Sequence, residues 1–175
     1  MTEFELRDKI SLYLDRYFYT EPEVRSICRT GRVDICITHR KDIVKAYPIG
    51  IEVKRFDDKR GKDVGDWLKQ AQRYSGLTWP LGKMLIIVAP QISGLVFDEG
   101  KLTSHNHVVN GHPHPHHNVS TFLGQFGVGE FQRYIWHDYH LNKDVKLARI
   151  VFKGSVIWDQ NGDVLNCHHY DRLCR

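Results

Sequence analysis

A short stretch of alternating residue types constrains the fold of this chain more than any other feature. Residues 49–54 read Ile-Gly-Ile-Glu-Val-Lys, so apolar residues alternate with glycine and two charged residues. In a β-strand this alternation places the apolar side chains on one face and Glu52 and Lys54 on the other. Charged groups on such a core-like strand are costly to bury unless a partner binds them. The segment therefore predicts a buried strand that carries a polar site.

Asp34 lies in a second apolar run, residues 33–37, and a polar turn is predicted at residues 39–42. A hairpin through that turn would bring Asp34 beside Glu52 and Lys54, with the functional groups converging in one pocket. Two carboxylates at one point are typical ligands of a hard divalent cation such as Mg²⁺.

A predicted helix follows, with Gln70 and Tyr74 one turn apart on the same face. In this order the elements resemble the PD-(D/E)xK nuclease superfamily, in the branch with a Gln-x-x-x-Tyr helix, as in RecB-like and lambda-exonuclease-like enzymes. The similarity covers residues 1–90, about half of the chain. Asp34 corresponds to the motif aspartate, with Val33 where the family name has proline, and Glu52-Val53-Lys54 corresponds to the (D/E)xK element.

The resemblance implies a nuclease that uses Mg²⁺ or Mn²⁺ and hydrolyses phosphodiester bonds, most often in DNA. Asp34, Glu52 and the Val53 carbonyl would hold the metal, and Lys54 would orient the attacking water or offset transition-state charge. Gln70 would contact a phosphate or a water molecule, and Tyr74 would hold the scissile strand. The alternatives are a surface strand with a weak Glu–Lys pair and a helix with an ordinary polar side.

A carboxylate of the first helix is a further candidate ligand, because relatives in this branch complete the metal site in that way. Glu5 is the candidate, although Thr2 and Glu5 also form a capping-box pattern, which is the stronger interpretation. Glu21 and Glu23 compete for the same role.

The charged loop after the Glu52 strand is a candidate nucleic-acid contact. Four basic side chains could bind phosphates beside the cleavage site, while nearby aspartates dilute their charge and make a solvated loop an equal alternative. These basic residues are Arg55, Lys59, Arg60 and Lys62.

The predicted fold class is α/β, a restriction-endonuclease-like core with a mixed central sheet flanked by helices in the order αβββαβ. The predicted elements are a helix at 3–18, strands at 24–28, 32–38 and 43–55, a helix at 63–75 and a strand at 83–89. A single domain is expected, with the core at 1–90, a histidine-rich loop at 91–120 and a β-rich extension at 121–175.

Histidine and cysteine clusters suggest a second kind of metal site, for zinc above all. The histidines are His105, His107, His112, His114, His116 and His117, and the cysteines are Cys28, Cys36, Cys167 and Cys174. The resemblance also raises an iron–sulfur cluster, but only two late cysteines are present to join Cys28. A polar loop and free thiols are the alternatives.

Composition narrows the class of protein without deciding it. The net charge of +4 is compatible with nucleic-acid binding but does not require it. The longest apolar run, residues 84–89, is far too short for a membrane span, and the acidic first residues are unlike a signal peptide, so an intracellular protein is expected. The rival functions are a non-catalytic nucleic-acid-binding or interaction protein on the same fold and a zinc-binding regulatory protein.

Overall fold

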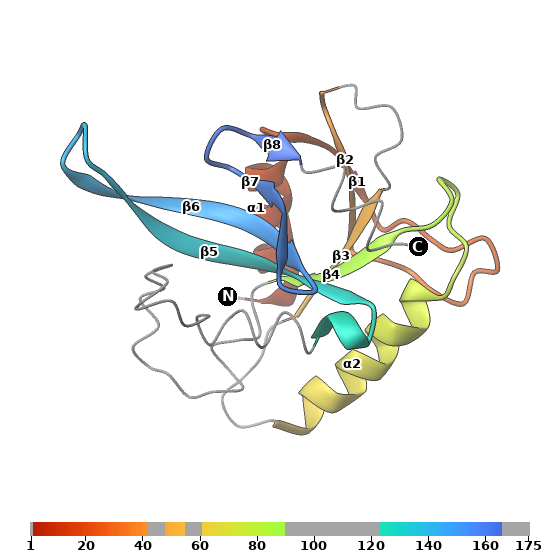
Figure 1. Cartoon of the computed structure of the whole chain (residues 1–175). Helices are drawn as coiled ribbons and strands as arrows, with labels where there is room; N and C mark the ends of the chain where they lie inside the picture. The colour runs from red at the N-terminus through yellow and green to blue at the C-terminus, as the bar shows by residue number, and fades with distance from the viewer. Residues whose placement is uncertain (1, 42–47, 55–60, 90–122, 166–175) are drawn as a thin grey trace.

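The computed structural model describes residues 2–41, 48–54, 61–89 and 123–165, and these form an α/β fold built on a mixed sheet (Figure 1). The helices are α1 (Glu3–Leu14) and α2 (Gly61–Ser75). The strands are β1 (Phe18–Pro22), β2 (Ile35–His39), β3 (Ile49–Val53), β4 (Leu85–Ala89), β5 (Val128–Asp138), β6 (Lys143–Phe152), β7 (Ser155–Asp159) and β8 (Val164–Leu165).

The strands lie in the sheet in chain order, from β1 at one edge to β8 at the other. β3 pairs in parallel with β4, and β4 pairs in parallel with β5, whereas the other neighbouring strands are antiparallel. The predicted α/β class with a mixed sheet is therefore confirmed. The first half follows the order αβββαβ, but its first strand is β1 and not the predicted strand at 24–28. The finer restriction-endonuclease-like assignment stays a prediction.

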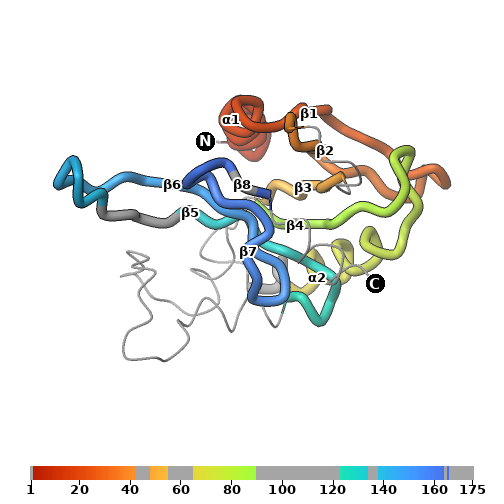
Figure 2. Tube along the Cα trace, turned by 45° about the horizontal axis from the view of Figure 1, so that its top comes forward, coloured from red at the N-terminus to blue at the C-terminus, as the bar shows by residue number. Residues whose placement is uncertain are grey.

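The two helices cover opposite faces of the sheet, as Figure 2 shows. Ile10 and Leu14 of α1 pack on the face formed by Ile35, Ile51 and the other odd-numbered residues of β2 and β3. α2 packs on the opposite face, where Trp67, Ala71 and Tyr74 meet Cys36, Ile86 and Val88. Because both faces are covered, β3 and β4 are buried along their whole length, as expected of parallel strands.

The N-terminal boundaries differ from the predicted ones. The structure ends α1 at Leu14, not at residue 18, and Phe18 begins the edge strand β1. Phe18 is fully buried and packs edge-on against Trp158 and His39, so tertiary burial competes with continuation of the helix. The predicted strand at 24–28 is wrong, because that segment forms only an isolated bridge from Arg25 to Arg32.

The C-terminal half continues the central sheet. Residues 121–175 were expected to be β-rich, and within them β6 and β7 form a hairpin in which Lys153 and Gly154 turn with φ of 49° and 77°. Two successive positive φ values are typical of a tight hairpin turn. β5 joins β4 directly, so the β-rich segment widens the sheet that carries Glu52 and does not form a separate layer. No helix in the described residues is long and apolar enough to span a membrane.

Candidate active site

Backbone contacts place Asp34 beside Glu52 at the end of the β2–β3 ladder. Ile35 pairs with Ile51, and Asp34 directly precedes Ile35. The Asp34 N–H donates to the Ile51 carbonyl at 3.1 Å, and the Val53 N–H donates to the Asp34 carboxylate, so the residues on either side of Glu52 hold Asp34 in place. Glu52 lies on the face covered by α2, because it alternates with Ile51 and Val53, which face α1.

The Asp34 carboxylate is fixed by the backbone of the neighbouring strand. Its Oδ2 accepts a hydrogen bond from the Val53 N–H at 2.8 Å. Partial burial raises the pKa of Asp34, while the Val53 N–H and the Lys54 charge act in the opposite direction. The remaining oxygen is therefore held in a defined orientation beside Glu52.

Glu52 is the most unusual residue of the site. Its side chain is only 2 % exposed, and no described residue provides a hydrogen-bond partner for its Oε1. Burial, and next the Asp34 charge, raise the pKa of Glu52 to about 8, although Lys54 opposes the shift. A buried carboxyl group with one unpartnered oxygen is costly in a folded protein unless something binds it.

Lys54 joins this carboxylate pair to the first helix. Its Nζ lies 3.6 Å from Glu52 Oε2 and 3.9 Å from Glu3 Oε1, and its side chain is a quarter exposed. The first turn of α1 thus meets the end of β3. Glu3 also raises the pKa of both Asp34 and Glu52, as a smaller effect than burial.

The helix acid beside the site is Glu3 and not Glu5. Glu5 Oε2 accepts a hydrogen bond from the Thr2 N–H at 2.7 Å, and the Glu5 N–H donates to Thr2 Oγ1, which completes the capping box. The capping interpretation is therefore confirmed for Glu5. Glu23 is also engaged elsewhere, in ion pairs with Arg7 and Arg32. The acidic first turn was the available signal for Glu3, but only tertiary packing shows which acid faces Lys54.

Gln70 and Tyr74 contact each other. Gln70 Nε2 donates to the Tyr74 hydroxyl at 2.9 Å, and the Tyr74 ring packs edge-on against Trp79. Their helix, α2, covers the face of the sheet that bears Glu52. In the described part of the chain, neither side chain forms a hydrogen bond with Asp34, Glu52 or Lys54.

A further buried carboxylate lies on the same face, two strands from Glu52. Glu52 pairs with Val88, and Val88 pairs with Glu130 of β5. Glu130 is fully buried, accepts a hydrogen bond from Gln132 Nε2 at 2.8 Å, and lies roughly 10 Å from Glu52 by strand spacing. The sequence analysis missed it, although Glu130 and Gln132 alternate with Phe131 in the way that identified Glu52.

Asp34 and Glu52 offer carboxylate oxygens, which suit Mg²⁺ or Mn²⁺ better than a metal that prefers sulfur or imidazole ligands. Among the described residues, no group of three or more His, Cys, Asp and Glu side chains could hold a metal ion together. Mg²⁺ is commonly bound through one or two carboxylates while it keeps several waters. The free Glu52 Oε1 and the adjacent Asp34 oxygen fit that pattern of donors.

Several predicted site residues lie outside the described residues. Among them are Arg55, Lys59, Arg60, the six clustered histidines, Cys167 and Cys174, and the side chain of Lys62 is likewise not described. Cys28 is exposed. Cys36 is buried under α2, and burial raises its pKa to about 12, which disfavours the thiolate that binds metals.

No known protein-family model matches the chain, and neither a curated protein nor a solved structure is significantly similar to it. The functional argument therefore depends on the geometry of the site.

Proposed function

We propose that this protein is a Mg²⁺- or Mn²⁺-dependent nuclease with a restriction-endonuclease-like core, acting on DNA. The observation that carries the proposal is the buried Glu52 beside Asp34 and Lys54, with an oxygen for which the described residues provide no hydrogen-bond partner. Pairs of acids in which burial and mutual repulsion raise a pKa are typical of functional sites.

The cost of this arrangement is the reason to infer a ligand. Burial and the neighbouring Asp34 both disfavour the ionised form of Glu52. A structural role would be served better by an apolar residue at this position, since β3 and β4 are buried on both faces. A bound cation would compensate both carboxylates at once.

Asp34 and Glu52 are the residues that would hold the cation. The ion would supply positive charge that lowers the pKa of a water molecule and offsets charge on the phosphate. The Val53 N–H keeps the Asp34 carboxylate in its orientation, and Glu3 and Glu52 keep the Lys54 ammonium at the site. Lys54 would then donate a hydrogen bond to a phosphate oxygen as negative charge develops there.

A non-catalytic nucleic-acid-binding protein on the same fold is the second candidate. The hydrogen bond between Gln70 and Tyr74 favours it, because the two side chains expected at the reaction centre engage each other. If substrate binding broke this hydrogen bond, Gln70 and Tyr74 could contact the substrate, as the nuclease proposal requires.

A cleavage assay tests the proposal. Plasmid and single-stranded DNA would be incubated with Mg²⁺, Mn²⁺ or EDTA, for the wild-type protein, Glu52→Gln and a matched control, Asp66→Asn, which alters an exposed carboxylate of α2. We expect cleavage only with metal, a loss of at least about 100-fold in Glu52→Gln, and wild-type rates in the control. Full activity in Glu52→Gln would rule out the site.

A further inference from the structure

An irregular hairpin at residues 25–32 is held firmly between the sheet and the end of α2. Arg25 and Arg32 form a bridge, and the Ser26 N–H donates to the Gly31 carbonyl at 2.9 Å. The Gly31 N–H returns a hydrogen bond to Ser26 Oγ at 3.0 Å. The Ile27 N–H donates to the Thr78 carbonyl at 2.9 Å, which ties the hairpin to the segment after α2. The side chains of this hairpin therefore project from an ordered backbone.

Gly31 allows the hairpin to approach α2 closely. A Cβ atom at this position would lie 2.5 Å from Leu77 Cδ1 and 3.1 Å from Tyr74 Cε1, closer than atoms can pack without movement. The absence of a side chain at Gly31 thus brings the hairpin against Tyr74, on the same side of the sheet as Glu52.

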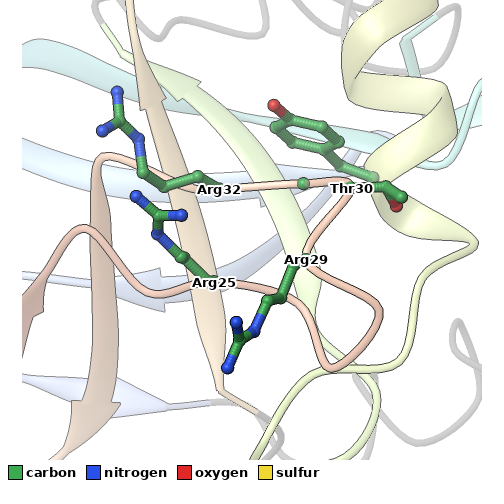
Figure 3. A pocket seen from close by; sticks show the side chains of 6 residues that line it. Arg25, Arg29, Thr30 and Arg32 are labelled. Atoms are coloured by element: carbon green, nitrogen blue, oxygen red, sulfur yellow. The ribbon is translucent and has the colours of Figure 1, made fainter.

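Three exposed arginines and Tyr74 surround a pocket at this contact, which we call the arginine pocket (Figure 3). The pocket has a volume of about 200 Å³ and is lined by Arg25, Arg29, Thr30, Gly31, Arg32 and Tyr74. Figure 3 shows Arg25 and Arg32 projecting from the paired backbone and Arg29 from the turn. Arg73 adds a guanidinium 5.3 Å from the centre of the Tyr74 ring.

The positive charge of the arginine pocket is only partly compensated. Glu23 Oε2 lies 3.6 Å from Arg32, but Glu23 is shared with Arg7 through its other oxygen. Within the described residues, Arg25 and Arg29 have no acidic partner within ion-pair distance. Guanidinium groups bind phosphate through two parallel hydrogen bonds, so such a cluster is suited to a phosphate group.

Arg29 has a backbone conformation that glycine or asparagine would adopt at lower cost. Its φ is 60°, in the left-handed region, where a residue with a Cβ loses roughly 1 kcal/mol or more. A small residue at position 29 would make the hairpin more stable. The sequence instead has a strained arginine on this exposed turn, which is consistent with a binding role for its side chain.

We propose that the arginine pocket binds backbone phosphates of a single nucleic-acid strand and positions that strand toward Asp34 and Glu52. Asp34 follows Arg32 by two residues, a backbone span of at most about 7 Å. Arg7 connects the two places, since it pairs with Glu23, which pairs with Arg32, and its charge also acts on Asp34. Phosphate binding stands on the arginines alone, whereas delivery of a strand for cleavage rests on the proposed nuclease function.

The test measures binding of a labelled single-stranded DNA of about 16 nucleotides by fluorescence anisotropy, in EDTA so that cleavage does not interfere. Wild-type protein is compared with Arg25→Gln, Arg29→Gly and the control Arg16→Gln, which removes an exposed arginine just after α1, the helix on the opposite face. Salt is varied from about 50 to 200 mM.

We expect Arg25→Gln and Arg29→Gly each to lower the slope of log affinity against log salt by about 0.7, the value for one lost phosphate contact on a single strand. Affinity at low salt should fall several-fold in both variants, and the control should match the wild type. Because glycine relieves the left-handed strain at Arg29, the melting temperature of Arg29→Gly should be equal or higher, which separates lost binding from unfolding.

Unchanged affinity and salt slope in both arginine variants would overturn the inference. Binding of inorganic phosphate without binding of the oligonucleotide would overturn it as well. The nuclease proposal is judged separately by cleavage with Mg²⁺. Arginine-dependent binding without cleavage would support the phosphate site and reject the nuclease proposal. Cleavage with arginine-independent binding would support the nuclease proposal and reject the phosphate site.

Discussion

Glu52 shows how a single buried carboxyl group can report on function. Its neighbours on β3 are apolar and the strand is fully buried. The carboxyl group nevertheless has a second acid beside it and an oxygen with no partner in the described part of the chain. Such a residue reduces the stability of the protein without a ligand, which leads to a measurable pH dependence.

The first prediction concerns stability without metal. Because the pKa of Glu52 is raised from its ordinary value of 4.5 to about 8, the folded state keeps a proton that the unfolded state releases between these values. The Glu52 contribution to stability is therefore fully present below about pH 4.5 and is lost as pH rises to about 8, by on the order of a few kcal/mol.

Urea unfolding in EDTA at about pH 5, 7 and 9 measures this effect. Glu52→Gln has no titrating group, so its stability should gain relative to the wild type as pH rises, whereas Asp66→Asn should follow the wild type. An equal pH dependence in the wild type and Glu52→Gln would show that Glu52 does not titrate in this range.

At the scale of elements, α1 carries two acids with separate roles in its first turn, only two residues apart. Glu5 closes the capping box and Glu3 lies beside Lys54. The second prediction is that Glu5→Ala lowers the melting temperature while DNA cleavage per folded molecule is kept. Glu3→Ala should change cleavage and its pH profile, because it removes a charge that raises the pKa of Asp34 and Glu52.

Circular dichroism melting and cleavage rates against pH distinguish the two variants. The division of roles would be wrong if Glu5→Ala, and not Glu3→Ala, displaced the pH profile.

The α2 helix carries the third prediction. Among the described residues, Gln70 and Tyr74 form a hydrogen bond with each other and not with the carboxylates. Gln70→Ala and Tyr74→Phe should therefore reduce cleavage less than alanine at Asp34, Glu52 or Lys54. Loss of this neutral hydrogen bond should cost about 1 kcal/mol of stability. Single-turnover rates and urea unfolding check both parts, and a Gln70→Ala protein with full activity would assign the pair to packing alone.

At the scale of the whole molecule, binding of a cation should be coupled to folding and to protons. A cation held by Asp34 and Glu52 requires both carboxylates, so it must displace the proton that Glu52 retains below about pH 8. The fourth prediction is that Mg²⁺ affinity rises by up to about tenfold per pH unit between pH 6 and 8 and then levels off.

Mg²⁺ should accordingly raise the melting temperature more at pH 8 than at pH 6, and EDTA should reverse the gain. Titration calorimetry in two buffers of different ionisation enthalpy would measure the released proton. Glu52→Gln should show neither the proton nor the thermal shift, and a pH-independent affinity in the wild type would contradict the assignment of Glu52 as a ligand.

Local sequence determined the parts of this protein that depend on short-range periodicity. Alternation over residues 49–54 predicted a buried strand with Glu52 on the face opposite to Ile51, because strand side chains alternate by geometry. The Thr2–Glu5 cap and the helix bearing Gln70 and Tyr74 were predicted for the same reason, since their interactions span a few residues.

Only the tertiary structure decided which distant groups meet. Phe18 leaves the helix because Trp158, 140 positions later, helps to bury it. Helix packing brings Glu3 to Lys54, and strand order places Glu130 in register with Glu52 across β4. No local sequence pattern encodes either contact. The arginine pocket forms because Gly31 lets its hairpin reach Tyr74, a contact between segments about forty residues apart. Such contacts depend on the sum of burial over the whole chain, which a window of sequence does not contain.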